Sequence, residues 1–184
     1  MSRDDFERLE AIFTGEFEDA YVERNKDAPN HRRPFWDELL RRAPVQSALE
    51  VGCGVDINQR ALAELQRALP DVGAVRARAR ALPFADGCFE LVFTAGVLMH
   101  QTAATLAPVL RELLRVSGRY LLACEYAHAD EAEIPYRGMS QVLFKRDYAS
   151  AFARIVPELR LSATGHLSRA EGWDDVTWWL LERI

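Results

Sequence analysis

Residues Ser47 to Leu62 read SALEVGCGVDINQRAL, and this stretch decides the fold. It opens with the apolar run Ala48 to Val51, which predicts a strand, and continues into a turn that contains Gly52 and Gly54. Such a turn lets a nucleotide-like ligand approach the backbone closely, because glycine has no Cβ to block it. From Asp56 on, the pattern is that of the acidic end of a later strand that enters a helix. The segment therefore combines the glycine turn that follows a first strand with the acidic end of a later strand.

Downstream, short apolar runs alternate with helical patterns, which predicts a sheet with crossover helices. Phe89–Phe93 and Tyr120–Ala123 are nearly all apolar, as expected of strands covered on both faces. Between them we expect a helix with Thr102 as its N-cap and Gly118 as its stop. The stretch LFKRDYASAFARIVP predicts a further helix, and ELRLSATGHL and DDVTWWLLERI predict an antiparallel pair that closes the sheet.

The composition indicates one compact domain and excludes several functional classes. The 184 residues are 49% hydrophobic, enough for a substantial core. A net charge of −5 lacks the basic surplus that nucleic-acid binding needs. Three dispersed cysteines favour neither a disulfide framework nor a metal site. The charged N-terminus does not resemble a signal peptide, and no apolar run has membrane length, so we expect a cytoplasmic protein.

Helical spacing of apolar residues at Phe6–Phe13 and again at Phe35–Leu40 predicts two helices near the N-terminus. We therefore divide the chain into an N-terminal helical lid segment, residues 1–45, and the sheet domain, residues 46–184.

The chain resembles the class I S-adenosylmethionine-dependent methyltransferases. LEVGCG looks like their first motif, and ALPFADGCFELVF looks like the loop and fourth strand after the adenine site. The blocks VFTAGVLMH, CEYAHADEAEIPYRG, LFKRDYA and DDVTWWLLER together resemble the methylases associated with pseudaminic acid biosynthesis. The resemblance implies a Rossmann-like, doubly wound, mostly parallel sheet and S-adenosylmethionine as the cofactor. Arg78 departs from it, because the similar proteins usually have an acidic residue there, beside the adenine.

The stretch from Val51 to Leu82 is one strand-helix unit too short for such a fold, since one βαβ unit takes about 30 residues or more. We favour the interpretation that the first helix is absent just after Gly54. Asp56 then ends the second strand, Ala61–Leu69 form its helix and Ala74–Ala77 the third strand. The alternative keeps GCGVDINQRAL as the first turn and helix, and places the missing unit near Val75.

Several residues are candidates for holding the cofactor. Glu50 is expected to hold a cationic or hydroxyl group through a charge-assisted hydrogen bond. Asp56 either accepts the ribose hydroxyls or caps the following helix. Thr94, Gly96 and Leu98 follow an apolar strand and are expected to border the methionine part. The resemblance implies that Tyr21, Arg24 and Asn25 cover the amino-acid end. With Gly52 and Gly54, these form the predicted cofactor site.

His100 is the predicted general base, because its unperturbed pKa lies near operating pH; the alternative is a surface histidine that caps the next helix. Glu125 and Tyr126, at the end of the fifth strand, are the other catalytic candidates. A cation pair in loops over a crevice suits a carboxylate or phosphate, or else forms a solvated cluster with nearby acids. The candidates for substrate binding are Tyr136, Arg137, Lys145 and Arg146.

These features predict methyl transfer to a hydroxyl or amine of a polar, anionic small molecule. A sugar or nonulosonic acid is what the resemblance implies. Two alternatives stay open: a degenerate fold that binds without turnover, and a cyclising reaction within S-adenosylmethionine. We expect no metal and no nucleic-acid or membrane partner, with a homodimer as the open alternative to a monomer.

Overall fold

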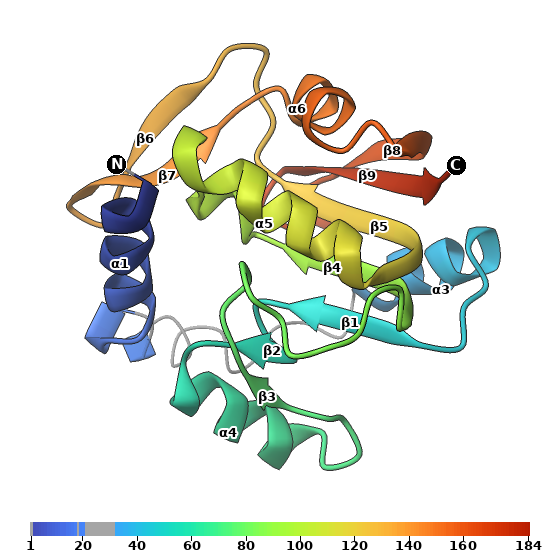
Figure 1. Cartoon of the computed structure of the whole chain (residues 1–184), viewed down its shortest axis with the longest axis horizontal. Helices are drawn as coiled ribbons and strands as arrows, with labels where there is room; N and C mark the ends of the chain where they lie inside the picture. The colour runs from blue at the N-terminus through green and yellow to red at the C-terminus, as the bar shows by residue number, and fades with distance from the viewer. Residues whose placement is uncertain (1, 18, 21–31) are drawn as a thin grey trace.

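The computed structural model describes residues 2–17, 19–20 and 32–184. Within these, a seven-stranded sheet has the order β3-β2-β1-β4-β5-β9-β8, and β6 and β7 form a separate hairpin (Figure 1). The strands are β1 (Ala48–Val51), β2 (Val55–Asp56), β3 (Val75–Arg76), β4 (Phe89–Ala95), β5 (Ser117–Glu125), β6 (Ala132–Tyr136), β7 (Met139–Lys145), β8 (Leu159–Leu167) and β9 (Val176–Arg183). The helices are α1 (Ser2–Phe13), α3 (Arg33–Arg42), α4 (Gln59–Ala68), α5 (Ala103–Val116) and α6 (Tyr148–Ile155), with 3-10 turns η2 (Leu98–His100) and η3 (Arg169–Glu171).

The pairing confirms the predicted α/β sheet. Strands β3, β2, β1, β4 and β5 pair in parallel, and β9 runs antiparallel to both β5 and β8. This is the Rossmann-like arrangement with an antiparallel C-terminal pair that the sequence indicates.

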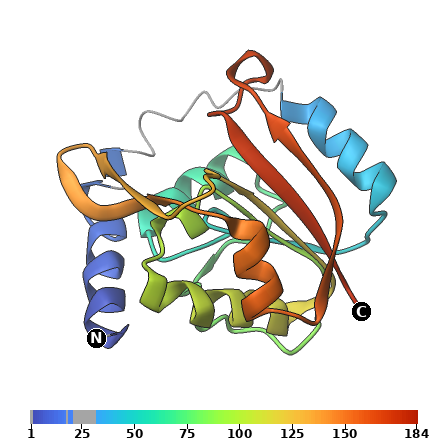
Figure 2. The same cartoon turned by 90° about the horizontal axis from the view of Figure 1, so that it is seen from above.

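The sheet separates two apolar cores, and α5 and α6 cover one face while α3 covers the other (Figure 2). Side chains of β5 alternate between them, as the period of a strand requires. Leu121 and Ala123 pack in the core beneath α5 and α6, whereas Leu122 and Cys124 pack in the core that contains Leu39 of α3. Both faces of β5 are therefore buried, which explains its nearly continuous apolar sequence.

The shortened crossover is where the favoured interpretation places it. Only Gly52, Cys53 and Gly54 lie between β1 and β2, and Gly52 N–H donates to the carbonyl of Val55 at 2.8 Å. Val51 is the only residue of β1 that pairs with β2, so β2 continues the sheet beyond the end of β1. Such a junction needs no crossover helix. The alternative, a first helix built from GCGVDINQRAL, is wrong, because β2 pairs as a strand with both β1 and β3.

Two predicted boundaries are wrong. The helix expected across LFKRDYASAFARIVP begins only at Tyr148, where Asp147 accepts the N–H of Ser150 as its N-cap; the preceding Leu143–Lys145 belong to β7. Gly118 does not stop α5, which ends at Val116. It lies inside β5, where a Cβ would come within 2.7 Å of the Gly87 carbonyl oxygen, so its role is close backbone approach.

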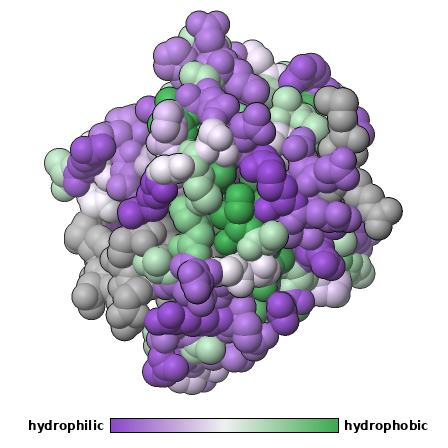
Figure 3. All heavy atoms as spheres, turned by 90° about the vertical axis from the view of Figure 1, so that its left-hand side faces the viewer, coloured by the Kyte–Doolittle hydropathy of each residue, from purple (hydrophilic) through white to green (hydrophobic). Residues whose placement is uncertain are grey.

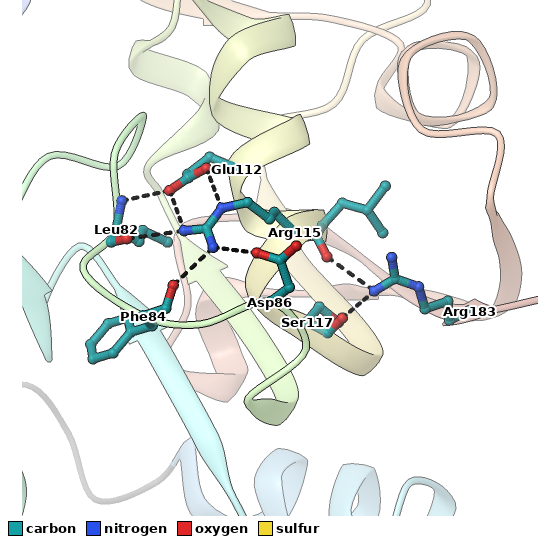
Figure 4. A network of polar contacts seen from close by, with 8 residues as sticks. Leu82, Phe84, Asp86, Glu112, Arg115, Ser117 and Arg183 are labelled. Carbon is teal, nitrogen blue, oxygen red and sulfur yellow. Dashed lines mark hydrogen bonds and ion pairs between the residues drawn. The ribbon is translucent and has the colours of Figure 1, made fainter.

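A polar network holds the loop between β3 and β4 against α5 (Figure 4). Arg115 donates to the carbonyls of Leu82 and Phe84 at 3.0 and 2.8 Å, and pairs with Asp86 at 2.7 Å. Glu112 accepts the N–H of Leu82 at 2.6 Å and pairs with Arg115. The loop that follows Ala77–Arg80 is thus fixed in place, which matters because those residues line the cavity described next.

Candidate functional site

A cavity lies at the carboxyl ends of β1, β2 and β4, beneath the apolar face of α1. Figure 3 faces this side of the molecule and shows a band of hydrophobic residues down its middle, flanked by hydrophilic ones. The lining comprises Phe6, Leu9, Glu10, Phe13 and Phe17 from the N-terminal segment, Val51, Gly52, Val55, Asp56 and Ile57 around the β1–β2 turn, Ala77–Arg80 after β3, residues 95–97 and 99–101 after β4, Val109 and Tyr136.

Gly52 forms the floor of the cavity at the tip of β1. Its φ is 112°, and a Cβ there would lie 2.3 Å from Cγ2 of Val97, so only glycine fits without displacement. Gly96 also lines the cavity with a positive φ of 73°. Gly54, the other glycine of the turn, is buried and instead accepts the N–H of Val75 at 3.0 Å, so it joins β2 to β3. The structure therefore brings Gly52 and Gly96 into the cavity and leaves Gly54 outside its lining.

Two carboxylates lie close together under the turn. Burial raises the pKa of Glu50 to about 7, and the neighbouring charge of Asp56 raises it further in the same direction. Burial also raises the pKa of Asp56, which lines the cavity. Asp56 accepts the N–H of Asn58 at 2.7 Å, and it is Asn58 that caps α4. A cation in the cavity would relieve the repulsion between these two acids.

Arg78 forms an ion pair with an acid of α1. Glu10 lies 2.8 Å from Nε of Arg78 and 2.8 Å from Nε of Arg80, and all three line the cavity. Arg80 also lies over the ring of Phe6, 4.7 Å from its centroid. Sequence reasoning did not find Glu10; the helical apolar pattern of α1 predicts a packed face but not the surface on which it packs.

His100 lies at the other end of the cavity. Its Nδ1 is 2.7 Å from the carbonyl oxygen of Val142, which only accepts, so Nδ1 carries the proton and Nε2 is the basic nitrogen. Burial lowers the pKa of His100 to about 4, which keeps the ring neutral at physiological pH. The ring packs against Phe13 and Tyr136, with centroids 4.8 and 5.7 Å away. The ring is therefore neutral and oriented, and it is not a surface helix cap. The expectation that its pKa lies near operating pH is wrong, because burial lowers the pKa and makes the neutral ring a weaker base.

Glu125 does not line the cavity. It is fully buried beneath the turn after β4, where its Oε1 accepts from Thr94 Oγ1 and Leu98 N–H at 3.0 Å and its Oε2 accepts from Met99 N–H at 3.0 Å. Burial raises its pKa to about 7 even though these donors lower it. Thr94 and Leu98 are likewise buried behind the turn. These three predicted site residues support the loop that bears His100 and lie outside the lining.

The predicted substrate-binding residues separate into two groups. Tyr136 lines the cavity, and Arg137, in the turn of the β6–β7 hairpin, lies over its ring. Lys145 instead packs against Tyr126, 5.5 Å from the ring centroid, and neither lines the cavity. Arg146 is 3% exposed and bonds to the carbonyl of Gln101. Tyr21, Arg24 and Asn25 lie outside the described residues.

The described residues offer neither a metal centre nor a membrane-spanning helix. They contain no group of three or more His, Cys, Asp or Glu side chains that could hold a metal ion. No helix among them is long and apolar enough to cross a membrane.

Comparisons with known proteins agree on the fold. Residues 40–121 match the family model of the methyltransferase domain. No curated protein matches the sequence. Magnesium protoporphyrin IX methyltransferase from Synechocystis PCC 6803, solved with bound S-adenosylmethionine, is 14% identical with a TM-score of 0.67, over 98% of this chain and 97% of that one. The 1,6-didemethyltoxoflavin-N1-methyltransferase of Burkholderia thailandensis, solved with its substrate and S-adenosylhomocysteine, is 12% identical with a TM-score of 0.71, over 95% and 87%. A methyltransferase of Haloferax volcanii, solved in complex with the activator Trm112, is similar at 12% identity, with a TM-score of 0.67 over 95% and 96%. The chain therefore has the fold of the class I S-adenosylmethionine-dependent methyltransferases.

Proposed function

We propose that this protein transfers the methyl group of S-adenosylmethionine to a hydroxyl or amine of a small molecule. The observation that carries the proposal is that one cavity is lined both by a cofactor-type turn and by a histidine. The turn supplies the open backbone of Gly52 and the half-buried acid Asp56, and the histidine is the neutral His100. The family-model match and the folds of the methyltransferases solved with cofactor or product agree with it.

The residues of the cavity suit this cofactor. S-adenosylmethionine is a cation that supplies an electrophilic methyl group when bound. Asp56 lines the cavity; Glu50 does not, but it lies close enough for the charge of Asp56 to raise its pKa, beyond the larger effect of burial. A cation bound beside Asp56 would stabilise the ionised form of both acids. Ile57, Ala77 and Ala79 provide apolar contacts for an adenine ring, and Gly52 leaves space beside the backbone.

In this proposal the residues of this chain orient the acceptor, enclose it and remove its proton. His100 accepts the proton of the acceptor hydroxyl or amine at Nε2, because Nδ1 is occupied by Val142. The first part of the N-terminal segment acts as the lid: Phe6, Leu9 and Phe13 of α1 face the cavity and exclude water from it. The later part, α3, packs in the core on the other face of the sheet and does not line the cavity. Tyr21, Arg24 and Asn25 are proposed to complete the lid.

Two acceptor classes are supported by different residues. An acidic sugar or nonulosonic acid, the class implied by the resemblance to the pseudaminic acid-associated methylases, is supported by Arg137 alone, which lies over the ring of the cavity residue Tyr136. A ring-bearing acceptor is favoured by the rings around His100. Phe13, Phe17 and Tyr136 line the cavity there, with Phe17 5.9 Å from Phe13 and 5.7 Å from Tyr136 between ring centroids.

Product analysis tests the reaction. Purified protein is incubated with methyl-labelled S-adenosylmethionine and two acceptor panels, one of acidic sugars and one of hydroxylated or aminated aromatic compounds. The proposal expects S-adenosylhomocysteine and a labelled acceptor in equal amounts. Release of methylthioadenosine without any acceptor would instead establish cyclisation, and binding without turnover of any panel member would favour a non-catalytic role.

Cytoplasmic location and the absence of nucleic-acid partners stay proposals, supported by the acidic composition. The homodimer is also a proposal, which light scattering of the purified chain will test.

A further inference from the structure

The base His100 lies in a loop, residues 96–101, that has little regular structure of its own. It contains only the short η2 turn between β4 and α5. A base has to be held to within a fraction of an ångström of its working geometry. Contacts with neighbouring elements must therefore hold this loop.

One end of the loop is held through its N–H groups. The carboxylate of Glu125, at the end of β5, accepts the backbone N–H groups of Val97, Leu98 and Met99 at 3.2, 3.0 and 3.0 Å. Both carboxyl oxygens accept backbone N–H groups, and such hydrogen bonds are about twice as strong as neutral ones in the fraction of molecules in which the side chain is ionised. The three residues immediately before His100 are thereby fixed to the sheet.

The other end is held through a carbonyl. Arg146, directly after β7, donates from Nη2 to the carbonyl oxygen of Gln101 at 2.8 Å. Its position is unfavourable for stability alone. The side chain is buried, and its Nε and Nη1 have no hydrogen-bond partner among the described residues, although Glu131 lies 3.4 Å from Nε. A buried cation with incomplete hydrogen bonding is costly, and the rings of Phe144 and Tyr148, 5.3 and 5.8 Å from the guanidinium, offset part of that cost. The hydrogen bond to Gln101 is the contact that ties this cation to the loop of His100.

We propose that Glu125 and Arg146 are positioning residues that clamp the loop on either side of His100, so that Nδ1 stays on Val142 and Nε2 stays available to the cavity. The role of His100 as base rests on the proposed function. The clamp itself does not. Because Val142 and Arg146 both belong to the β7 side of the hairpin, the element that carries Tyr136 also sets the orientation of the base.

Nuclear magnetic resonance of histidine-labelled full-length protein tests the clamp without cofactor or acceptor. The ring of His100 faces Phe13 of α1, Tyr136 of β6 and Val142 of β7, and spectra of His100→Asn assign its signals. In the wild type we expect a single tautomer with the proton on Nδ1 and no titration between pH 5 and pH 8. In Arg146→Met and Glu125→Gln we expect mixed tautomers and a midpoint displaced upward, toward the ordinary value of about 6.5.

Arg160→Met is the matched control, because Arg160 is an exposed arginine of β8 whose partner is Glu182. It should leave the His100 spectrum unchanged. Arg146→Lys keeps a cation and should give an intermediate shift, and it decides the test if Arg146→Met does not fold. Folded clamp variants with the wild-type tautomer and titration would overturn the proposal. Failure of S-adenosylmethionine to bind would overturn the proposed function and leave the clamp intact.

Discussion

At the scale of single residues, the missing side chain of Gly52 keeps space open at the tip of β1. Gly52→Ala adds a Cβ 2.3 Å from Val97 and keeps an unfavourable positive φ. We expect a loss of about 2 kcal/mol of unfolding free energy, measured by urea denaturation, from strain and overpacking together. We also expect weaker binding of S-adenosylhomocysteine by calorimetry.

Gly138→Ala is the control for the cost of placing a side chain on a residue with positive φ. Gly138 has a φ of 79° and no atom within 4 Å of a built Cβ, so it carries the positive-φ cost without the clash. Equal effects of the two variants on ligand affinity would contradict the role assigned to Gly52.

Glu50 makes stability depend on pH. Its folded pKa, about 7, is raised above the ordinary 4.5, so its contribution to stability is fully present below about pH 4.5 and is lost as pH rises through 7. Glu50→Gln should therefore be more stable than the wild type at pH 8, by about 3 kcal/mol at most, and about equal at pH 4.5. Thermal unfolding across this range measures it, with exposed Glu158→Gln as control. A wild-type pH profile in Glu50→Gln would refute the assignment.

His100→Asn tests the roles of the two ring nitrogens separately. Asparagine can still donate to the Val142 carbonyl, but it has no atom at the position of Nε2. We expect kcat to fall by about 10²–10⁴-fold, the usual contribution of a general base, with cofactor affinity unchanged. Because burial lowers the pKa of His100 to about 4, wild-type kcat should be flat from pH 5.5 to 8. Undiminished kcat in the variant would exclude His100 as the base.

Some of these site residues could be predicted from the sequence, and others could not. Glu50, Gly52 and Asp56 are recognisable because a strand end and a glycine turn are local patterns. Arg146 was predicted to bind substrate, yet the structure buries it under the loop after β4. That placement depends on how β6 and β7 pair, which no local pattern encodes.

At the scale of elements, α1 is held over the cavity by polar contacts along its length. Asp5 accepts from Thr102 at 3.2 Å, Arg8 donates to the Gln141 carbonyl at 3.0 Å, and Glu10 pairs with Arg78 and Arg80. Glu10→Gln should loosen the helix by about 1 kcal/mol, within the range of partly exposed ion pairs.

Hydrogen exchange measures this loosening as faster exchange of the amides of residues 2–13. Asp4→Asn, an exposed acid on the same helix, is the control. Unchanged exchange in Glu10→Gln would show that its ion pairs do not hold the lid.

The β6–β7 hairpin was not predicted at all. AEIPY contains Pro135, which disfavours a central strand, and the apolar residues of MSQVLFK run straight into a helical pattern. The hairpin forms because the buried Leu143 and Phe144 pair with β6 and the buried Val142 contacts His100 after β4. Tertiary packing overrode the local pattern.

At the scale of the whole molecule, the length of one interval of the chain predicted the missing crossover. The interval from Val51 to Leu82 is too short for two crossovers, and the structure removes one by placing β2 at the tip of β1. The order of the main sheet follows from parallel pairing plus the C-terminal antiparallel pair. The docking of α1 on the strand ends could not be predicted, because its partners lie far away in the sequence.

The central claim is that the corner where β1, β2 and β4 end accommodates an adenosyl group despite the missing crossover helix. Isothermal titration calorimetry of the full chain with S-adenosylmethionine and S-adenosylhomocysteine tests it most directly. We expect saturable one-site binding of both compounds with micromolar or tighter dissociation constants, corresponding to about −8 kcal/mol or better. Folded protein that shows no binding of either compound at high micromolar concentration would contradict it.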